Sequence, residues 1–127
     1  MDPFEILKEK YPDIRFELYT RERDMSVLLT GFIVPISLRN TGIGTNFMND
    51  LIKIADETGY KIKLSPSDSY GGNKNRLYDF YSRFGFIRNK GKHRDFSHME
   101  SMYREPKQTD NLNEEITRIK SIIKTVI

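Results

Sequence analysis

The hydrophobic positions near the start of the chain change their spacing twice. Residues 3–10 carry apolar side chains at helical intervals after Asp2, a residue type that favours the start of a helix, and they predict a short helix. Residues 14–19 alternate apolar and polar side chains, the pattern of a half-buried strand. Residues 27–34 form a more continuous apolar run, which predicts a buried strand antiparallel to the first. Gly31 interrupts this run, and a glycine inside a strand often marks a bulge.

The chain beyond this strand alternates helical and extended patterns. Apolar residues recur at helical intervals from Gly42 onward, and Gly59 is suited to end that helix. The apolar positions of the helix are Ile43, Phe47, Leu51, Ile54 and Ala55. Residues 60–64 predict a strand that lies parallel to the second strand, because a helix crosses over between them. The remaining predicted elements are a helix over residues 74–84 and two paired strands, at residues 86–87 and 99–104.

The junction between the second strand and the long helix carries the clearest chemical signal. The motif Arg39-x-x-Gly42-x-Gly44 places one cation and two glycines there. Glycine lets the backbone turn sharply and approach a ligand closely, and the first amides of a helix have no intrahelical acceptor. The arrangement therefore predicts a phosphate-binding loop. It lacks the third glycine of a dinucleotide fingerprint, since Phe47 stands there, and no Walker lysine follows Gly44.

Two motifs in the chain resemble those of the GNAT-type N-acetyltransferase family. The glycine motif is similar to the family's acyl-CoA pyrophosphate loop, and Phe80-Tyr81-x-x-x-Gly85-Phe86 is similar to its second signature. The resemblance covers residues 25–106 and implies an α+β (mixed α/β) fold, a mixed sheet with helices on both faces. Few residues precede the central strand, so we expect a minimal or N-terminally truncated member, similar to small phage or mobile-element acetyltransferases.

The composition changes after residue 106. Residues 1–106 are expected to form the GNAT-like domain, and residues 107–127 a linker and an extra C-terminal amphipathic helix outside the resemblance. Apolar residues four and three positions apart give this helix the seam of a coiled coil. The seam residues are Leu112, Ile116, Ile119, Ile123 and Val126. Packing on the chain's own sheet and pairing with a second copy in a homodimer both fit this seam.

The resemblance implies a binding mode for acetyl-CoA, the expected co-substrate. Its pantetheine arm would pair with the main chain at the end of the second strand, at Phe32, Ile33 and Val34. Its phosphates would be held by Arg39 and by the amides of the loop and the first helical turn. These amides belong to Asn40, Thr41, Gly42, Ile43, Gly44 and Thr45.

The resemblance also implies catalytic roles. A bulge at Gly31 would present an amide to the thioester carbonyl, and Tyr81 would supply a proton to the leaving thiolate. Many members carry an asparagine seven residues before that tyrosine, where this chain has Lys74, so the neighbouring Asn75 is the candidate cofactor contact.

The expected function is acetyl transfer from the thioester to an amine by direct attack. The acceptor amine, either a small molecule or a protein lysine or N-terminus, is not defined by the sequence. Glu17, Glu22, Asp68 and a chain of water molecules are open candidates for the general base. The alternative is a catalytically silent GNAT-fold protein that acts by binding a macromolecular partner.

A basic segment at residues 88–95 precedes the last strand. It predicts a solvated hairpin loop more readily than a contact with an anionic substrate or the cofactor phosphates. Nucleic acid is not an expected partner, because no aromatic residues interleave the positive charges. His93 and His98 are expected on the surface, and since neither is spaced with carboxylates as ligands, no metal site is predicted.

Composition bounds these expectations. A chain of 127 residues forms one compact domain, and its net charge of +3 suits an anionic cofactor. The absence of cysteine excludes disulfides and a thiolate nucleophile. No apolar run approaches the roughly 18 residues of a membrane span, and the N-terminus lacks the pattern of a secretory signal. The simplest expectation is a cytoplasmic protein that binds no membrane, located in the host cytoplasm if it is phage-encoded.

Overall fold

The structure, a computed structural model, describes residues 2–66 and 73–107. These residues form helices and strands of the predicted type and order. The α-helices are α1 (Ile6–Lys10), α2 (Ile43–Thr58) and α3 (Lys74–Ser82). The strands are β1 (Arg15–Arg21), β2 (Ser26–Ile33), β3 (Lys61–Leu64), β4 (Ile87–Arg88) and β5 (Met102–Arg104). Short 3-10 helices lie at Ile36–Leu38 and Gly91–His93.

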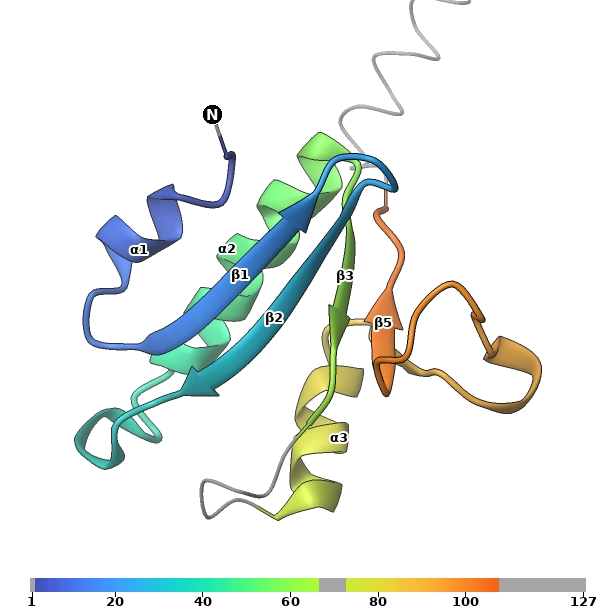
Figure 1. Cartoon of the computed structure of the whole chain (residues 1–127). Helices are drawn as coiled ribbons and strands as arrows, with labels where there is room; N and C mark the ends of the chain where they lie inside the picture. Colours follow the sequence, from blue (N-terminus) through green and yellow to red (C-terminus); the bar gives the residue numbers. More distant parts are fainter. Residues whose placement is uncertain (1, 67–72, 108–127) are drawn as a thin grey trace, which may run out of the picture.

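The strands form one mixed sheet in the order β1-β2-β3-β5-β4 (Figure 1). β1 and β2 pair antiparallel, β2 and β3 pair parallel, and β5 lies antiparallel between β3 and β4. The parallel pair forms because α2 carries the chain from the end of β2 back to the start of β3. The predicted mixed sheet, its antiparallel first pair, its parallel central pair and its paired last strands are confirmed.

Phe47 on α2 lies at the centre of the hydrophobic core. Its ring centroid lies 4.6 Å from that of Phe16 on β1 and 4.9 Å from that of Phe32 on β2. Tyr11, which follows α1, packs edge-on against the same ring at 5.4 Å. Burial of one phenylalanine side chain contributes about 1.5–3 kcal/mol. These contacts place α1 and α2 on the same face of the sheet.

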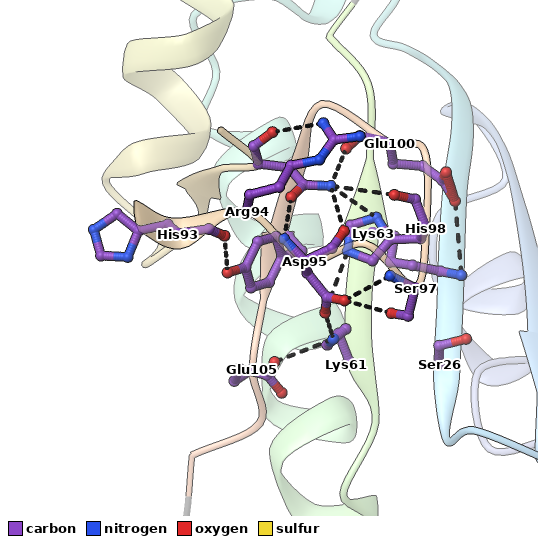
Figure 2. A network of polar contacts seen from close by, with 12 residues as sticks. Ser26, Lys61, Lys63, His93, Arg94, Asp95, Ser97, His98, Glu100 and Glu105 are labelled. Carbon is purple, nitrogen blue, oxygen red and sulfur yellow. Dashed lines mark hydrogen bonds and ion pairs between the residues drawn. The ribbon is translucent and has the colours of Figure 1, made fainter. Parts of the chain in front are cut away.

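A long loop contacts the other face of the sheet. Lys61, Lys63 and Tyr103 alternate with core residues along β3 and β5, so they point to the face opposite α2. The segment 89–101, which connects β4 to β5, lies over them and contacts them through hydrogen bonds and ion pairs (Figure 2). In the described residues this loop therefore covers part of the face opposite α2.

A buried ion pair ties α2 to β5 and to the end of α3. The Arg104 side chain is 5% exposed and donates to both carboxylate oxygens of Asp56, at 2.7 and 3.1 Å. Its Nε donates to the Phe84 carbonyl, two residues beyond α3, at 2.8 Å. The pair therefore fixes the position of α3 relative to the sheet.

Some element boundaries differ from the predictions. The first helix begins at Ile6 rather than residue 3, because the Asp2 carboxylate accepts the Phe4 amide and holds a turn there. The last strand begins at Met102 rather than residue 99, because the carbonyls before it bond to a side chain instead of a strand. The helix and seam predicted after residue 107 lie outside the described residues.

Candidate active site

A cleft opens where the two parallel strands separate. β2 and β3 pair over four positions, ending at Leu29 opposite Leu64, and β2 then continues alone on that side to Ile33. Below this point the two strands run apart, β3 towards α3 and β2 away from it (Figure 1). The cleft has a volume of about 470 Å³ and is lined by both strands, by α3 and by one residue that precedes β5. Its size falls in the range of about 300–1,000 Å³ that is usual for ligand sites.

A bulge lies at the mouth of this cleft. Arg15 pairs with Ile33 but Glu17 pairs with Thr30, so two residues of β2 oppose one residue of β1. One of the two is Gly31, which has a φ of +64° and lines the cleft. A left-handed glycine is the residue that such a bulge favours. The predicted bulge at Gly31 is confirmed, and its role towards a thioester stays a prediction.

The glycine loop leads from β2 into a long helix. Gly42 has a φ of +87° and immediately precedes α2, and a Cβ placed on it would meet no atom within 4 Å. Among the described residues, no backbone or side-chain acceptor bonds the amides of residues 42–45. Amides of this kind at the N-terminus of a 16-residue helix favour an anion through the helix dipole, and phosphate binding by them stays a prediction.

The loop packs against the end of β2. A Cβ on Gly44 would lie 3.4 Å from Cγ2 of Val34, so a side chain there would push the strand and helix apart. Arg39 lies beside this contact, with its Nε donating to the Val34 carbonyl at 3.1 Å. Asn40, whose φ is +66°, turns the chain between Arg39 and the start of α2. The structure thus brings together the residues predicted to hold phosphates and those predicted to pair with pantetheine.

Tyr81 on α3 lines the same cleft as Gly31. Its ring packs edge-on against Phe80 and Phe86, and burial raises the pKa of its hydroxyl from 10.0 to about 12. Tyr78, one turn earlier, instead lies against the Arg88 guanidinium at 4.0 Å and does not line the cleft. Of the two tyrosines, Tyr81 is the one near the divergence of β2 and β3.

The structure does not bring Asn75 to the cleft. Asn75 is exposed in the first turn of α3, and its amide donates to the side chain of Asn73, which caps the helix. Two proposed bases are also remote: Glu17 accepts a hydrogen bond from Tyr19 on the surface, and Glu22 lies in the turn between β1 and β2. Neither carboxylate lines the cleft. Asp68 lies outside the described residues.

One charged residue of the cleft was missed by the sequence analysis. Glu100 lines it, with a side chain that is 20% exposed. Its carboxylate lies 3.6 Å from the ammonium of Lys63, which is 9% exposed. No local motif marks Glu100, because it reaches the cleft only through the pairing of β5 with β3.

The segment before Glu100 is organised by the side chain of Asn89. This buried amide donates to the carbonyls of Asp95, His98 and Glu100 at 3.0–3.3 Å and accepts the Asp95 amide at 2.6 Å. The Asp95 carboxylate in turn forms an ion pair with Lys61 (Figure 2). The Lys61 ammonium and the hydroxyl and amide of Ser97 hold the pKa of Asp95 well below its usual range.

His98 was predicted on the surface, and that prediction is wrong. Its side chain is 3% exposed and packs edge-on against Tyr103. Burial lowers the pKa of its imidazole, which keeps the ring neutral. The basic segment is therefore a braced loop rather than a simple solvated hairpin, although Lys90, Lys92, His93 and Arg94 stay largely on its outside.

Two kinds of feature are missing from the described part of the chain. Within residues 2–66 and 73–107, no group of three or more histidine or acidic side chains could hold a metal ion. No helix in the same residues is long and apolar enough to cross a membrane.

Two solved structures resemble this arrangement. One is a GNAT-family acetyltransferase from Staphylococcus aureus Mu50, which aligns with a TM-score of 0.54 and 20% sequence identity over 75% of this chain and 60% of the other. The second is a putative GNAT-family acetyltransferase from Bacteroides thetaiotaomicron, with a TM-score of 0.53 and 19% identity over 88% and 65%. This chain thus spans less than two thirds of each. No protein-family model and no curated protein sequence matches it. The chain has the GNAT fold.

Proposed function

We propose that the protein binds acetyl-CoA and transfers the acetyl group to an amine. The observation that carries this proposal is the alignment of three features along β2. The glycine loop with its unbonded amides follows the strand, the bulge at Gly31 interrupts it, and the cleft beside it contains Tyr81. An elongated ligand with phosphates at one end and a reactive group at the other fits such a series of sites.

The proposed binding mode uses main-chain groups for most of the ligand. The amides of residues 42–45 and the Arg39 guanidinium bind the phosphates, for which Arg39 exchanges its contact with the Val34 carbonyl. The main chain of residues 32–34 has no β3 partner and pairs with the pantetheine amides. The open space above Gly31 and Gly42 lets the ligand approach the backbone closely.

The proposed reaction is a direct transfer. The amine loses a proton to water, because an aliphatic ammonium has an ordinary pKa of about 10.4 and no lone pair for attack. Its nitrogen attacks the thioester carbonyl, the new C–N bond forms and the C–S bond breaks. The Gly31 amide stabilises the carbonyl oxygen as charge develops on it. Tyr81 donates a hydrogen bond to the leaving sulfur, the second proton of the attacking nitrogen reaches that sulfur through water, and the amide and the free thiol are released.

Calorimetric titration with acetyl-CoA tests the binding step. We expect saturable binding by the wild type and its loss in Gly42→Val, because a β-branched residue is strained at a φ of +87° and occupies the phosphate space. Gly91→Val is the matched control, because Gly91 also has a positive φ of +59° and open space around it but lies in the loop before β5. No binding by folded wild-type protein at millimolar acetyl-CoA contradicts the proposal.

One observation favours a second candidate, a silent GNAT-fold protein that binds a macromolecular partner. Phe96 and Met99 in the braced loop are 86% and 87% exposed, and neighbouring exposed apolar side chains suit a protein interface. The candidates differ in one measurement, the release of CoA in the presence of amines. Saturable acetyl-CoA binding without any transfer supports the silent protein.

A further inference from the structure

Glu100 lines the cleft, and the proposed reaction gives it no role. In the described part of the chain, Glu100 alone among the lining residues is charged. The other polar side chains of the lining, Thr30, Ser65 and Tyr81, are neutral hydroxyls, so Glu100 supplies the counter-charge for a cation there.

The surroundings of the carboxylate leave it able to bind another cation. The Met99 amide donates to Oε2 at 3.1 Å, and the Lys63 ammonium lies 3.6 Å from Oε1. A charged N–H···O hydrogen bond has a length of about 2.7–2.9 Å, so Lys63 attracts Glu100 by charge without a close hydrogen bond. A carboxylate offers about four lone-pair sites, and within residues 2–66 and 73–107 these two contacts leave some of them open.

An aliphatic amine acceptor arrives as an ammonium ion at neutral pH. Its transfer from water into a partly enclosed cleft is unfavourable unless an opposite charge and hydrogen-bond acceptors meet it there. Glu100 lines the same cleft as Gly31 and Tyr81, where the thioester is placed by the proposed function. A neutral arylamine needs no such counter-charge.

We infer that Glu100 determines specificity by binding the acceptor as a cation, so that the enzyme prefers aliphatic amines, which are charged at neutral pH, to neutral arylamines. This inference rests on the proposed function. Lys63 competes with the acceptor for the same carboxylate, so it limits the affinity of the site for amines.

The test uses acetyl-CoA with two amine probes, Nα-acetyl-lysine methylamide, which is cationic at pH 7, and aniline, which is neutral. Glu100→Gln should raise KM for the lysine probe about 10- to 100-fold, the loss of a hydrogen bond between charged groups, and leave KM for aniline unchanged. Lys63→Met should lower KM for the lysine probe, because it frees the carboxylate. If the pair of Lys63 and Glu100 were purely structural, the two variants would not change KM for the lysine probe in opposite directions.

Glu105→Gln is the matched control. Glu105 pairs with Lys61 at 3.2 Å in the same network but is 61% exposed and does not line the cleft. Because Glu100→Gln leaves Lys63 buried without its partner, the double variant Lys63→Met/Glu100→Gln removes both charges and must show the same rise in KM over Lys63→Met.

The outcomes distinguish failure of the role of Glu100 from failure of the proposed acetyl transfer. Equal KM values for the lysine probe in Glu100→Gln and Glu105→Gln overturn the role of Glu100, as do equal changes for both probes. Transfer to aniline but not to the lysine probe by the wild type overturns the cationic acceptor and leaves the proposed function standing. Acetyl-CoA binding with transfer to neither probe counts against the proposed function itself, and the inference falls with it.

Discussion

Replacement of Tyr81 by phenylalanine tests the proposed chemistry most directly. The ring is held by Phe80 and Phe86 at centroid distances of 5.3 and 5.8 Å, and Tyr81→Phe keeps that ring. Among the described residues, none accepts or donates a hydrogen bond at its hydroxyl. The free energy of unfolding should therefore change by about 1 kcal/mol or less.

The effect on turnover follows from the pKa of the buried hydroxyl. Burial raises it to about 12, whereas an ordinary thiol has a pKa of about 8.5. Complete proton transfer from Tyr81 to a thiolate is then unfavourable by about 3.5 units, roughly 5 kcal/mol. Tyr81 can still stabilise the developing thiolate through a hydrogen bond, which contributes about 1.5–3 kcal/mol when one partner is charged. We expect turnover to fall about 10- to 150-fold, towards the low end of the range for general acid catalysis.

The assay follows CoA release with a thiol reagent at saturating acetyl-CoA, and calorimetry checks that acetyl-CoA affinity is unchanged. Tyr78→Phe is the control, because that ring contacts Arg88 and lies outside the cleft. Full turnover by Tyr81→Phe, with acetyl transfer rate-limiting, refutes the role of its hydroxyl. A comparable loss in Tyr78→Phe would assign the hydrogen bond to Tyr78 instead.

The remaining predictions concern stability. Asp56→Ala should lower the free energy of unfolding in urea by about 3–5 kcal/mol, because it leaves the buried Arg104 guanidinium without its partner; a loss below 1 kcal/mol contradicts this. Stability should fall as pH rises from 10 to 12, since burial raises the pKa values of Tyr11 and Tyr81 to about 12 and the unfolded chain releases these protons first. Urea unfolding at pH 9 and 11 measures this loss of stability. The double variant Tyr11→Phe/Tyr81→Phe should lose less stability between the two pH values than the wild type, and an equal loss would show that these tyrosines do not cause it. Asn89→Ala should make the loop before β5 sensitive to proteases at pH 7 while β1 to β3 stay folded, and unchanged cleavage would show that other contacts hold the loop.

Local patterns predicted the frame of the site well. The period of apolar residues, the glycine at the end of α2 and the bulge glycine are each determined within a few residues of sequence, and the structure has all three where they were predicted. The strand, turn and helix around Gly42 and Gly44 were predictable from local sequence as well, because the positive φ at Gly42 favours glycine there.

Residues brought together by distant pairing were not predictable in the same way. Glu100 reaches the cleft only because β5 inserts between β3 and β4 and sets the position of the preceding residues. His98 was predicted on the surface. Its burial depends on Asn89, nine residues before it, and on Tyr103, five residues after it. The sequence of a short polar segment does not show which of its side chains will bond the backbone carbonyls that a neighbouring strand would otherwise bond.

The brief pairing of β2 with β3 has a consequence for the protein without ligand. Only four residue pairs join β1 and β2 to the other three strands within the sheet, and past Leu29 the main chain of β2 faces the cleft on that side. Amide hydrogens at residues 30–33 that point into the cleft should exchange with solvent faster than those of residues 27–29. A bound ligand that pairs with them would act as a missing strand and slow their exchange. The pair β1–β2 would then separate from the other three strands less often, so that occupancy of the cleft would control the rate of local opening of the sheet.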